Sequence, residues 1–154
     1  MSKVRDQLPA PPQAQGNYVP AVVEAGIVVT AGMTPRVDGE LVHTGRVGVE
    51  VSLEDAREAA SIALGNALSA ALAALGSDRL LDRVLRLTVY VACGPDFTGH
   101  TAVADGASSR LRDLLGDQGV ASRTAVGVAS LPGGACVELE LTGTWVTART
   151  TRGA

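Results

Sequence analysis

Apolar, mostly β-branched residues dominate residues 19–32 (VPAVVEAGIVVTAG), a composition typical of β-strands. Ala25 and Gly26 divide this stretch at its centre, where a glycine is typical of a turn. The pattern therefore predicts a β-hairpin. The next segment, residues 35–45, carries the turn signal Asp38-Gly39 and is predicted to be a loop.

Residues 52–76 carry the clearest helical pattern of the chain. Ser52 is a predicted N-cap with Asp55 three residues later, and Gly76 stands where the helix should stop. Leucines and alanines recur at helical spacing, which predicts a face that packs closely on a sheet: Leu64, Leu68, Leu72, Leu75, Ala60, Ala67 and Ala71.

The second half of the chain predicts three more strands and one more helix. Residues 83–93 alternate as a strand, in which Leu85 and Leu87 are assigned to the same face. A shorter helix is predicted at about residues 105–115, with Asp105 as its N-cap and Gly116 as its stop. Its predicted apolar face consists of Leu111, Leu114 and Leu115. The last two strands are predicted at residues 123–128 and 136–142.

These elements predict an α+β fold with the order β-β-α-β-α-β-β in one domain. A helix between two strands of one sheet implies a crossover, so the sheet is predicted to be mixed, with both helices on one face. The Pro-Gly-Gly turn at residues 132–134 is read as the connection that folds the strand of Arg123 back onto the strand of Glu138. Such a pair is either a structural ion pair or the floor of a binding site.

The face of the sheet away from the helices is predicted to combine Tyr90, arginines, carboxylates and small residues. Ala125, Gly127 and Ala129 are assigned to it together with Arg123, and small residues favour close approach by another surface. We therefore expect oligomerisation through this face, with polar residues at the clefts between subunits; a monomer with a hydrated sheet is the alternative.

Composition excludes several functional classes. The 154 residues carry 13 basic and 16 acidic side chains, a net charge of −3, and few aromatic residues, so neither RNA nor DNA is an expected partner. Lys3 is the only lysine and lies in the N-terminal tail, which excludes Schiff-base chemistry. The N-terminus lacks the apolar region of a signal peptide, and no apolar run is judged long enough to span a membrane, so a cytoplasmic location is predicted.

The cysteines and histidines indicate no metal or triad chemistry. Cys93 and Cys136 lack the spacing of a disulfide framework or a metal site and are read as small core residues. His43 and His100 lie far apart in loop-like sequence, which does not favour a zinc site or a Ser/His/Asp triad. We expect no metal and no cofactor.

Several motifs together resemble the YjgF/YER057c/UK114 family, also called the RidA family. They are GNYVPAV, TAGMTP, GELVHTGRVG, ADGAS and, most specifically, SRTAVGVASLPGGACVELE. The loop sequence and ADGAS resemble a longer subgroup that is labelled chorismate-mutase-like. The resemblance implies a chorismate-mutase-like homotrimer, with ligand sites in the clefts between subunits. It places the domain at residues 16–147, between an N-terminal tail or extended strap (1–15) and a C-terminal tail (148–154).

The resemblance also implies roles for four residues. Arg123 matches the arginine that grips a substrate carboxylate, for which the forked guanidinium is well suited. Glu138 matches the catalytic glutamate that handles a water or a proton, while Tyr18 and Gly32 match residues that line the cleft. In the deaminases of this family these parts hydrolyse a reactive enamine or imine to a 2-keto acid and ammonia.

This chain departs from the deaminase pattern in three places. Ala125 stands where the family has a cysteine, and Met33 where a glutamine is expected. The family's asparagine has no clear match, and Thr101 or Asp105 falls near its place. Without the resemblance, Arg123 would be read as an ion-pair partner of Glu138 or Glu140, and Asp105 as a helix cap.

Three hypotheses about function follow. The first is an enamine/imine deaminase acting on small amino-acid-derived intermediates. The second is a trimer that senses or binds a small carboxylate without turning it over, which the changes at Ala125 and Met33 favour. The third is a tailoring enzyme for another unsaturated carboxylate, suggested by the subgroup label alone.

Overall fold

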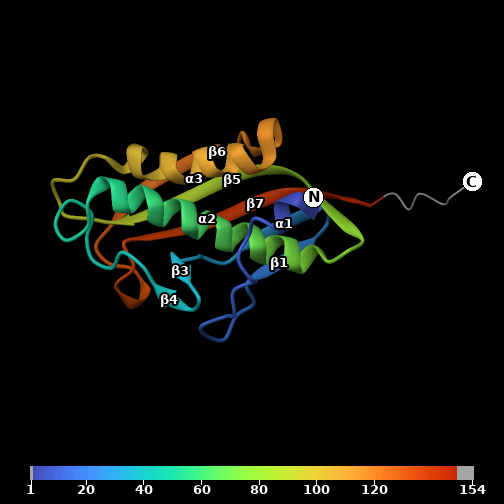
Figure 1. Cartoon of the computed structure of the whole chain (residues 1–154), viewed down its shortest axis with the longest axis horizontal. Helices are drawn as coiled ribbons and strands as arrows, with labels where there is room; N and C mark the ends of the chain where they lie inside the picture. The colour runs from blue at the N-terminus through green and yellow to red at the C-terminus, as the bar shows by residue number, and fades with distance from the viewer. Residues whose placement is uncertain (1, 149–154) are drawn as a thin grey trace, which may run out of the picture.

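The structure, a computed structural model, describes residues 2–148 and is built on one five-stranded sheet. The strand order is β1-β2-β7-β5-β6, and only β5 and β6 pair in parallel (Figure 1). The mixed sheet and the order of strands and helices are therefore as predicted. The strands are β1 (Ala21–Glu24), β2 (Ile27–Thr30), β5 (Arg79–Ala92), β6 (Ser122–Val128) and β7 (Val137–Thr147).

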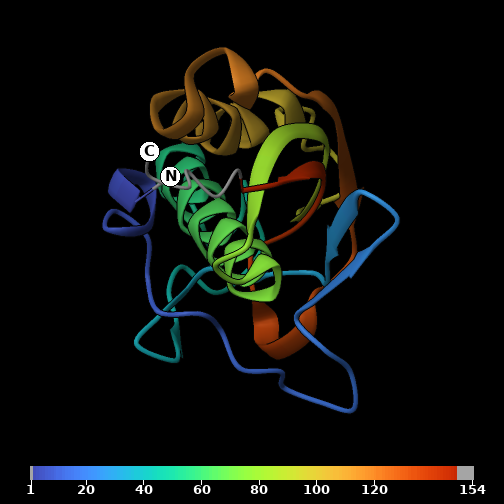
Figure 2. The same ribbon diagram turned by 90° about the vertical axis from the view of Figure 1, so that its right-hand side faces the viewer.

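Helices α2 (Leu53–Leu75) and α3 (His100–Leu115) pack side by side against one face of this sheet (Figures 1 and 2). The Ser52 hydroxyl accepts a hydrogen bond from the Asp55 N–H at 3.1 Å, which caps α2 as predicted. Gly76, with a φ of 72°, ends it. All the leucines and alanines of the predicted apolar stripe are buried, so α2 is the central helix of the core.

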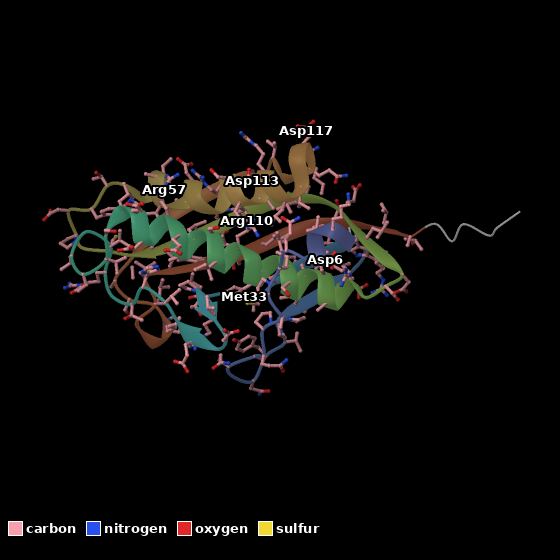
Figure 3. The ribbon with its side chains drawn as sticks, in the orientation of Figure 1. Asp6, Met33, Arg57, Arg110, Asp113 and Asp117 are labelled. Carbon is pink, nitrogen blue, oxygen red and sulfur yellow. The ribbon has the colours of Figure 1, made fainter. Side chains whose placement is uncertain are left out.

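The two helices touch closely at their N-terminal halves. The Arg57 guanidinium of α2 (labelled in Figure 3) donates a hydrogen bond of 2.6 Å to the Ala102 carbonyl of α3. Gly106 of α3 lies against the Arg57 backbone, where any Cβ would collide with the Arg57 carbonyl. Gly106 is therefore required for the distance between the helices.

The N-terminal residues lie along α2. Helix α1 (Ser2–Arg5) ends at Arg5, whose guanidinium donates to the carbonyls of Leu72 and Gly76 at 3.0 and 2.8 Å. The Ser69 hydroxyl donates to the Pro9 carbonyl at 2.7 Å. These contacts hold the N-terminal segment against α2 as an extended strap, which is one of the two alternatives that the sequence allows for residues 1–15. Of residues 148–154 only Ala148 lies within the described residues.

The segment predicted as a loop forms a small second sheet instead. Strands β3 (Arg36–Val37) and β4 (Glu40–Leu41) pair across a turn in which Asp38 and Gly39 both have positive φ. The turn signal was correct, but the two residues on each side of it are paired as strands.

The predicted hairpin between β6 and β7 is wrong. Strand β5 lies between them, pairing in parallel with β6 and antiparallel with β7. The connection over residues 129–136 includes a 3₁₀ turn, η2 (Pro132–Gly134), and passes the end of β5 rather than closing a tight hairpin. The glycines of this connection indicate a turn, but a turn signal does not specify which strands are neighbours in the sheet.

Two boundaries also differ from the sequence analysis. Strand β5 carries a register shift between Val84 and Arg86, so Leu85 is 42% exposed while Leu87 is buried. Helix α3 begins at His100 after Gly99, five residues earlier than predicted, so Asp105 is not its N-cap. The early start is explained by Val103 and Ala104, which are fully buried and extend the apolar face toward the N-terminus. A second 3₁₀ turn, η1 (Gly116–Gly119), follows α3.

Helix α2 is long and apolar enough to cross a membrane by length and composition alone, which corrects the reading that no run approaches that length. The small residues and Asn66 that separate the leucines of α2 do not lower its mean hydropathy below that of a membrane-spanning helix. However, 72% of the apolar window is buried inside the fold, so packing on the sheet accounts for its composition. The cytoplasmic location stays a prediction.

Candidate functional site

Arg123 lies on β6 and points toward α3, where its guanidinium is held by three groups. Nη1 donates hydrogen bonds of 2.8 Å to Asp105 Oδ1 and to Ser108 Oγ, and Nη2 lies 3.4 Å from the Thr101 carbonyl. The Arg123 side chain is 17% exposed. Within residues 2–148 its ion-pair partner is therefore Asp105, not Glu138 or Glu140, and Nη2 has one long contact.

The three partners lie on one face of α3 because they are spaced four and three residues apart. Thr101 and Asp105 were singled out in the sequence as possible replacements for the family's asparagine. Ser108 was not, although the i, i+4, i+7 spacing would have placed it beside them had the helix start been known. Asp105 is 48% exposed, so solvent weakens its ion pair with Arg123.

Glu138 lies on β7 against the backbone of Gly32. A Cβ at position 32 would collide with Glu138 Oε1, so only glycine fits beside this carboxylate. The segment is held in place by Met33, whose N–H and carbonyl exchange hydrogen bonds of 2.7 and 2.9 Å with Leu139. Two of the predicted site residues, Glu138 and Gly32, are thus neighbours.

Tyr18 lies near this second group rather than near Arg123. Tyr18, Gly32 and Met33 line one cavity of about 430 Å³ beneath the N-terminal strap. The Tyr18 side chain is half exposed, and its hydroxyl accepts a hydrogen bond of 3.2 Å from the Gln15 N–H.

Within one chain these two groups do not meet. Arg123 is level with Leu87 and Leu141, whose side chains are buried under the helices, whereas Glu138 is level with Tyr90 on the other face. Because side chains alternate between the faces of a strand, Arg123 and Glu138 project to opposite sides of the sheet.

The row of small residues on β6 therefore faces the helices, which corrects its assignment to the open face. Ala125 follows Arg123 on this row, and Gly127 lies against Cys93 and His100. The open face carries Tyr90, Val126, Glu138 and Glu140, together with Arg86, which donates to the Thr124 hydroxyl at 3.3 Å.

The electrostatics of the open face are acidic. Burial, followed by the charge of Glu140, raises the pKa of Glu138 above its usual range. The Tyr90 hydroxyl donates to Glu140 Oε1 at 3.3 Å, and burial raises the pKa of Tyr90 as well. Among residues 2–148, no arginine, lysine or histidine lies within ion-pair distance of Glu138. A carboxyl group that exchanges its proton closer to neutral pH is suited to general acid–base chemistry.

One group in the described part of the chain has ligands of the kind that metals use. The side chains of His43, Asp55 and Glu58 present ligand atoms within 4.8 Å of one another. However, His43 directs Nε2 to Glu58 at 3.0 Å and Nδ1 toward Asp55 at 3.9 Å. Each carboxylate therefore lies beside a different nitrogen of the ring, so in this structure His43 itself contacts both acidic groups.

The family model described as Endoribonuclease L-PSP matches residues 9–144. The chain is 35% identical to Protein TCP17 of Trypanosoma cruzi over 135 residues, which is 87% of this chain and 84% of that protein.

Two solved structures show the same fold. Protein Atu1372 of Agrobacterium tumefaciens, whose function is unknown, is 33% identical, with a TM-score of 0.83 over 93% of this chain and 90% of that one. TdcF of E. coli, solved with bound serine, is 23% identical, with a TM-score of 0.64 over 88% of this chain and 92% of that one.

Proposed function

This chain belongs to the Endoribonuclease L-PSP family, also known as the YjgF/UK114 family, and from that premise we propose that it is an enamine/imine deaminase. It hydrolyses small amino-acid-derived imines to 2-keto acids and ammonia, in clefts between the copies of a homotrimer. The observation that carries the proposal is the separation of Arg123 from Glu138 on opposite faces of one sheet. A second copy is needed to bring such groups together.

Arg123 would bind the substrate carboxylate through its Nη2 edge, where, in the described part of the chain, the Thr101 carbonyl at 3.4 Å is the one hydrogen-bond partner. A guanidinium can pair with two carboxylates at once through different edges, so Asp105 on Nη1 leaves this edge available. In support, serine, the ligand of TdcF, is a small amino acid that carries a carboxylate.

Glu138 of a neighbouring copy would supply the acid–base step. The carboxylate takes a proton from a water molecule as that water attacks the C=N carbon, and gives it to the nitrogen, which receives the π electrons of the C=N bond. It then takes the proton of the new hydroxyl group as the C=O bond of the keto acid forms and the C–N bond breaks. That second proton goes to the departing nitrogen, so one water is consumed, ammonia leaves and the carboxylate is regenerated. A pKa above the usual range suits a group that must both accept and donate within one cycle. Modest acid–base catalysis is sufficient because an imine is already activated toward attack by water.

The test generates 2-iminobutyrate in situ with a threonine dehydratase and traps it with semicarbazide. The protein should accelerate keto acid formation at micromolar concentration. Arg123→Ala should abolish the acceleration, whereas Arg112→Ala, which removes an exposed arginine from α3, should not change it. Absence of acceleration by the wild-type trimer would overturn the proposal.

A non-catalytic binder of small carboxylates is the second candidate, favoured by Ala125 and Met33, which stand where the deaminases of the family have a cysteine and a glutamine. If the protein is such a binder, 2-ketobutyrate should raise its melting temperature, and the protein should not accelerate imine hydrolysis. A melting-temperature measurement and the semicarbazide assay on one protein preparation therefore distinguish the deaminase from the binder.

The description of the family as an endoribonuclease also suggests ribonuclease activity. The net charge of −3 and the two carboxylates Glu138 and Glu140 on the open face disfavour binding of an RNA phosphate backbone, so the absence of a nucleic-acid partner stays our prediction. Incubation with a labelled single-stranded RNA should leave that RNA intact.

A further inference from the structure

A second cluster of reactive side chains lies where β5 ends and α3 begins. Cys93 follows β5, and its Sγ lies 3.4 Å from Nε2 of His100, the first residue of α3. Both side chains are half-buried rather than enclosed in the core. The sequence predicts a core position for Cys93 and a loop position for His100, because nothing in their spacing indicates that they meet.

Gly127 provides the space for this contact. A Cβ at position 127 would lie 2.5 Å from His100 Nε2 and 3.1 Å from Cys93 Sγ. Glycine inside a strand is less stable than alanine, and the φ of Gly127 does not require glycine. Its presence is therefore explained by the close approach of the imidazole and the thiol.

The imidazole is held in position by an aromatic ring. Phe97 packs edge-on against His100, with ring centroids 5.3 Å apart and planes at 72°. Phe97 itself fits against Gly99, where a Cβ would lie 2.9 Å from the ring. Two glycines thus shape this cluster, one on each side of the histidine.

The pair opens into a cavity of about 540 Å³, within the size range of small-molecule sites. Its walls are largely apolar, with Pro95, Phe97 and Val128 among them, and Arg46 lies at one side. The Arg46 guanidinium is fixed by Glu50 at 3.1 Å, so the polar groups left for a guest are the thiol, the imidazole and the remaining edge of this guanidinium.

The other thiol of the chain is different in kind. Cys136 is fully buried, and burial raises its pKa to about 11. It has no histidine beside it among the described residues, so Cys136 is an internal reference for an unreactive thiol.

We propose that Cys93 and His100 form a thiol nucleophile site for small α,β-unsaturated carbonyl compounds. His100 Nε2 takes the proton of the Cys93 thiol, and the sulfur forms a bond to the β-carbon of the guest. The π electrons of the C=C bond move to the α-carbon, which then receives the proton from His100. Nothing leaves, and no oxidant or reductant is consumed.

This site is independent of the proposed deaminase, because it requires neither the Arg123 guanidinium nor a carboxylate from a second copy. Loss of imine hydrolysis in Arg123→Ala should leave the thiol chemistry intact. The two proposals can therefore fail separately.

The test follows addition of N-ethylmaleimide to the native protein by intact mass, with the modified peptide identified afterwards. We expect one adduct, at Cys93, with a rate at pH 7 that exceeds that of N-acetylcysteine and saturates as the reagent concentration rises. His100→Gln should slow the addition roughly 10- to 100-fold at pH 7. The difference should shrink at about pH 10, where thiols ionise without assistance.

Three variants serve as comparisons. His43→Gln, the other histidine, and Cys136→Ala should leave the rate unchanged. Gly127→Ala keeps both reactive groups but separates them, so it should also slow the addition, and circular dichroism verifies that it folds. A rate no higher than that of N-acetylcysteine, an adduct at Cys136, or equal rates for wild type and His100→Gln at pH 7 would each overturn the proposal.

Discussion

Arg123 and Glu138 project from opposite faces of the same sheet. Arg123 is level with Leu87 and Leu141, three positions from the level of Glu138 and Tyr90, and an odd number of residues along a strand reverses the side chain. No rotamer change brings the two groups together in one chain. A reaction that uses both must join the α3 side of one copy to the open face of another.

That separation predicts complementation between two inactive variants. Arg123→Ala and Glu138→Gln should each lack imine hydrolysis alone. Mixed by unfolding and refolding together, they should recover roughly a quarter of wild-type activity, because random assembly leaves that share of clefts with both groups. The semicarbazide assay measures the recovered activity, and mass measurement verifies that the mixture contains mixed oligomers. If mixed oligomers form without any recovery of activity, the cleft is not shared between copies.

Asp105→Asn should strengthen carboxylate binding. The aspartate neutralises Arg123 through its 2.8 Å contact, and the amide keeps a hydrogen-bond acceptor while removing the charge. We expect 2-ketobutyrate to bind about 3- to 10-fold more tightly, as measured by calorimetry. Asp113→Asn, which removes the same charge from the exposed side of α3 (labelled in Figure 3), should have no effect. Weaker binding in Asp105→Asn would show that the aspartate positions the guanidinium instead.

Glu138→Gln should raise the melting temperature near pH 7. The pKa of Glu138 is raised in the folded chain, so protonation favours the fold: this contribution is present below the unfolded pKa of about 4.3 and is lost as pH rises through the higher folded value. The gain over wild type should therefore vanish toward pH 4. Thermal scans from pH 4 to pH 8 measure it.

Glu40→Gln, in the exposed hairpin of β3 and β4, is the matched control and should show no such trend. A lower melting temperature of Glu138→Gln at pH 7 would mean that its ionised carboxylate is stabilised by a cation, contrary to the structure.

The register shift in β5 separates two leucines that simple alternation would place together. Leu87→Ala should cost about 2–5 kcal/mol of unfolding free energy because Leu87 is buried, whereas Leu85→Ala should cost well under 1 kcal/mol. Urea denaturation followed by the fluorescence of Trp145 compares them. Equal losses would place both side chains in the core.

Local patterns were sufficient for most of the fold. The Ser52 cap, the leucine and alanine stripe and the Ala25-Gly26 turn each depend on neighbours in sequence, and the structure confirms all three. The position of β5 between β6 and β7 depends on long-range pairing, which a turn motif does not encode. The shift at Val84 likewise follows from how β5 fits β7, and not from its own residues.

The resemblance names candidate site residues but does not state where they lie relative to one another. The resemblance indicated Arg123, Glu138, Tyr18 and Gly32, and the structure places the last three near one another and Arg123 apart. Face assignment failed on β6 because both of its faces have small and apolar residues. The contact of Cys93 with His100 could not be predicted, since it depends on where α3 begins.

Helix α3 carries Thr101, Asp105 and Ser108 on the Arg123 side and His100 at its first turn, and Gly106 sets its spacing from α2. A methyl group at position 106 would push the whole rod outward, displacing both sets of side chains in a single rigid step. A substitution that shifts α3 as a whole is therefore expected to alter the groups around the arginine and the position of the imidazole together.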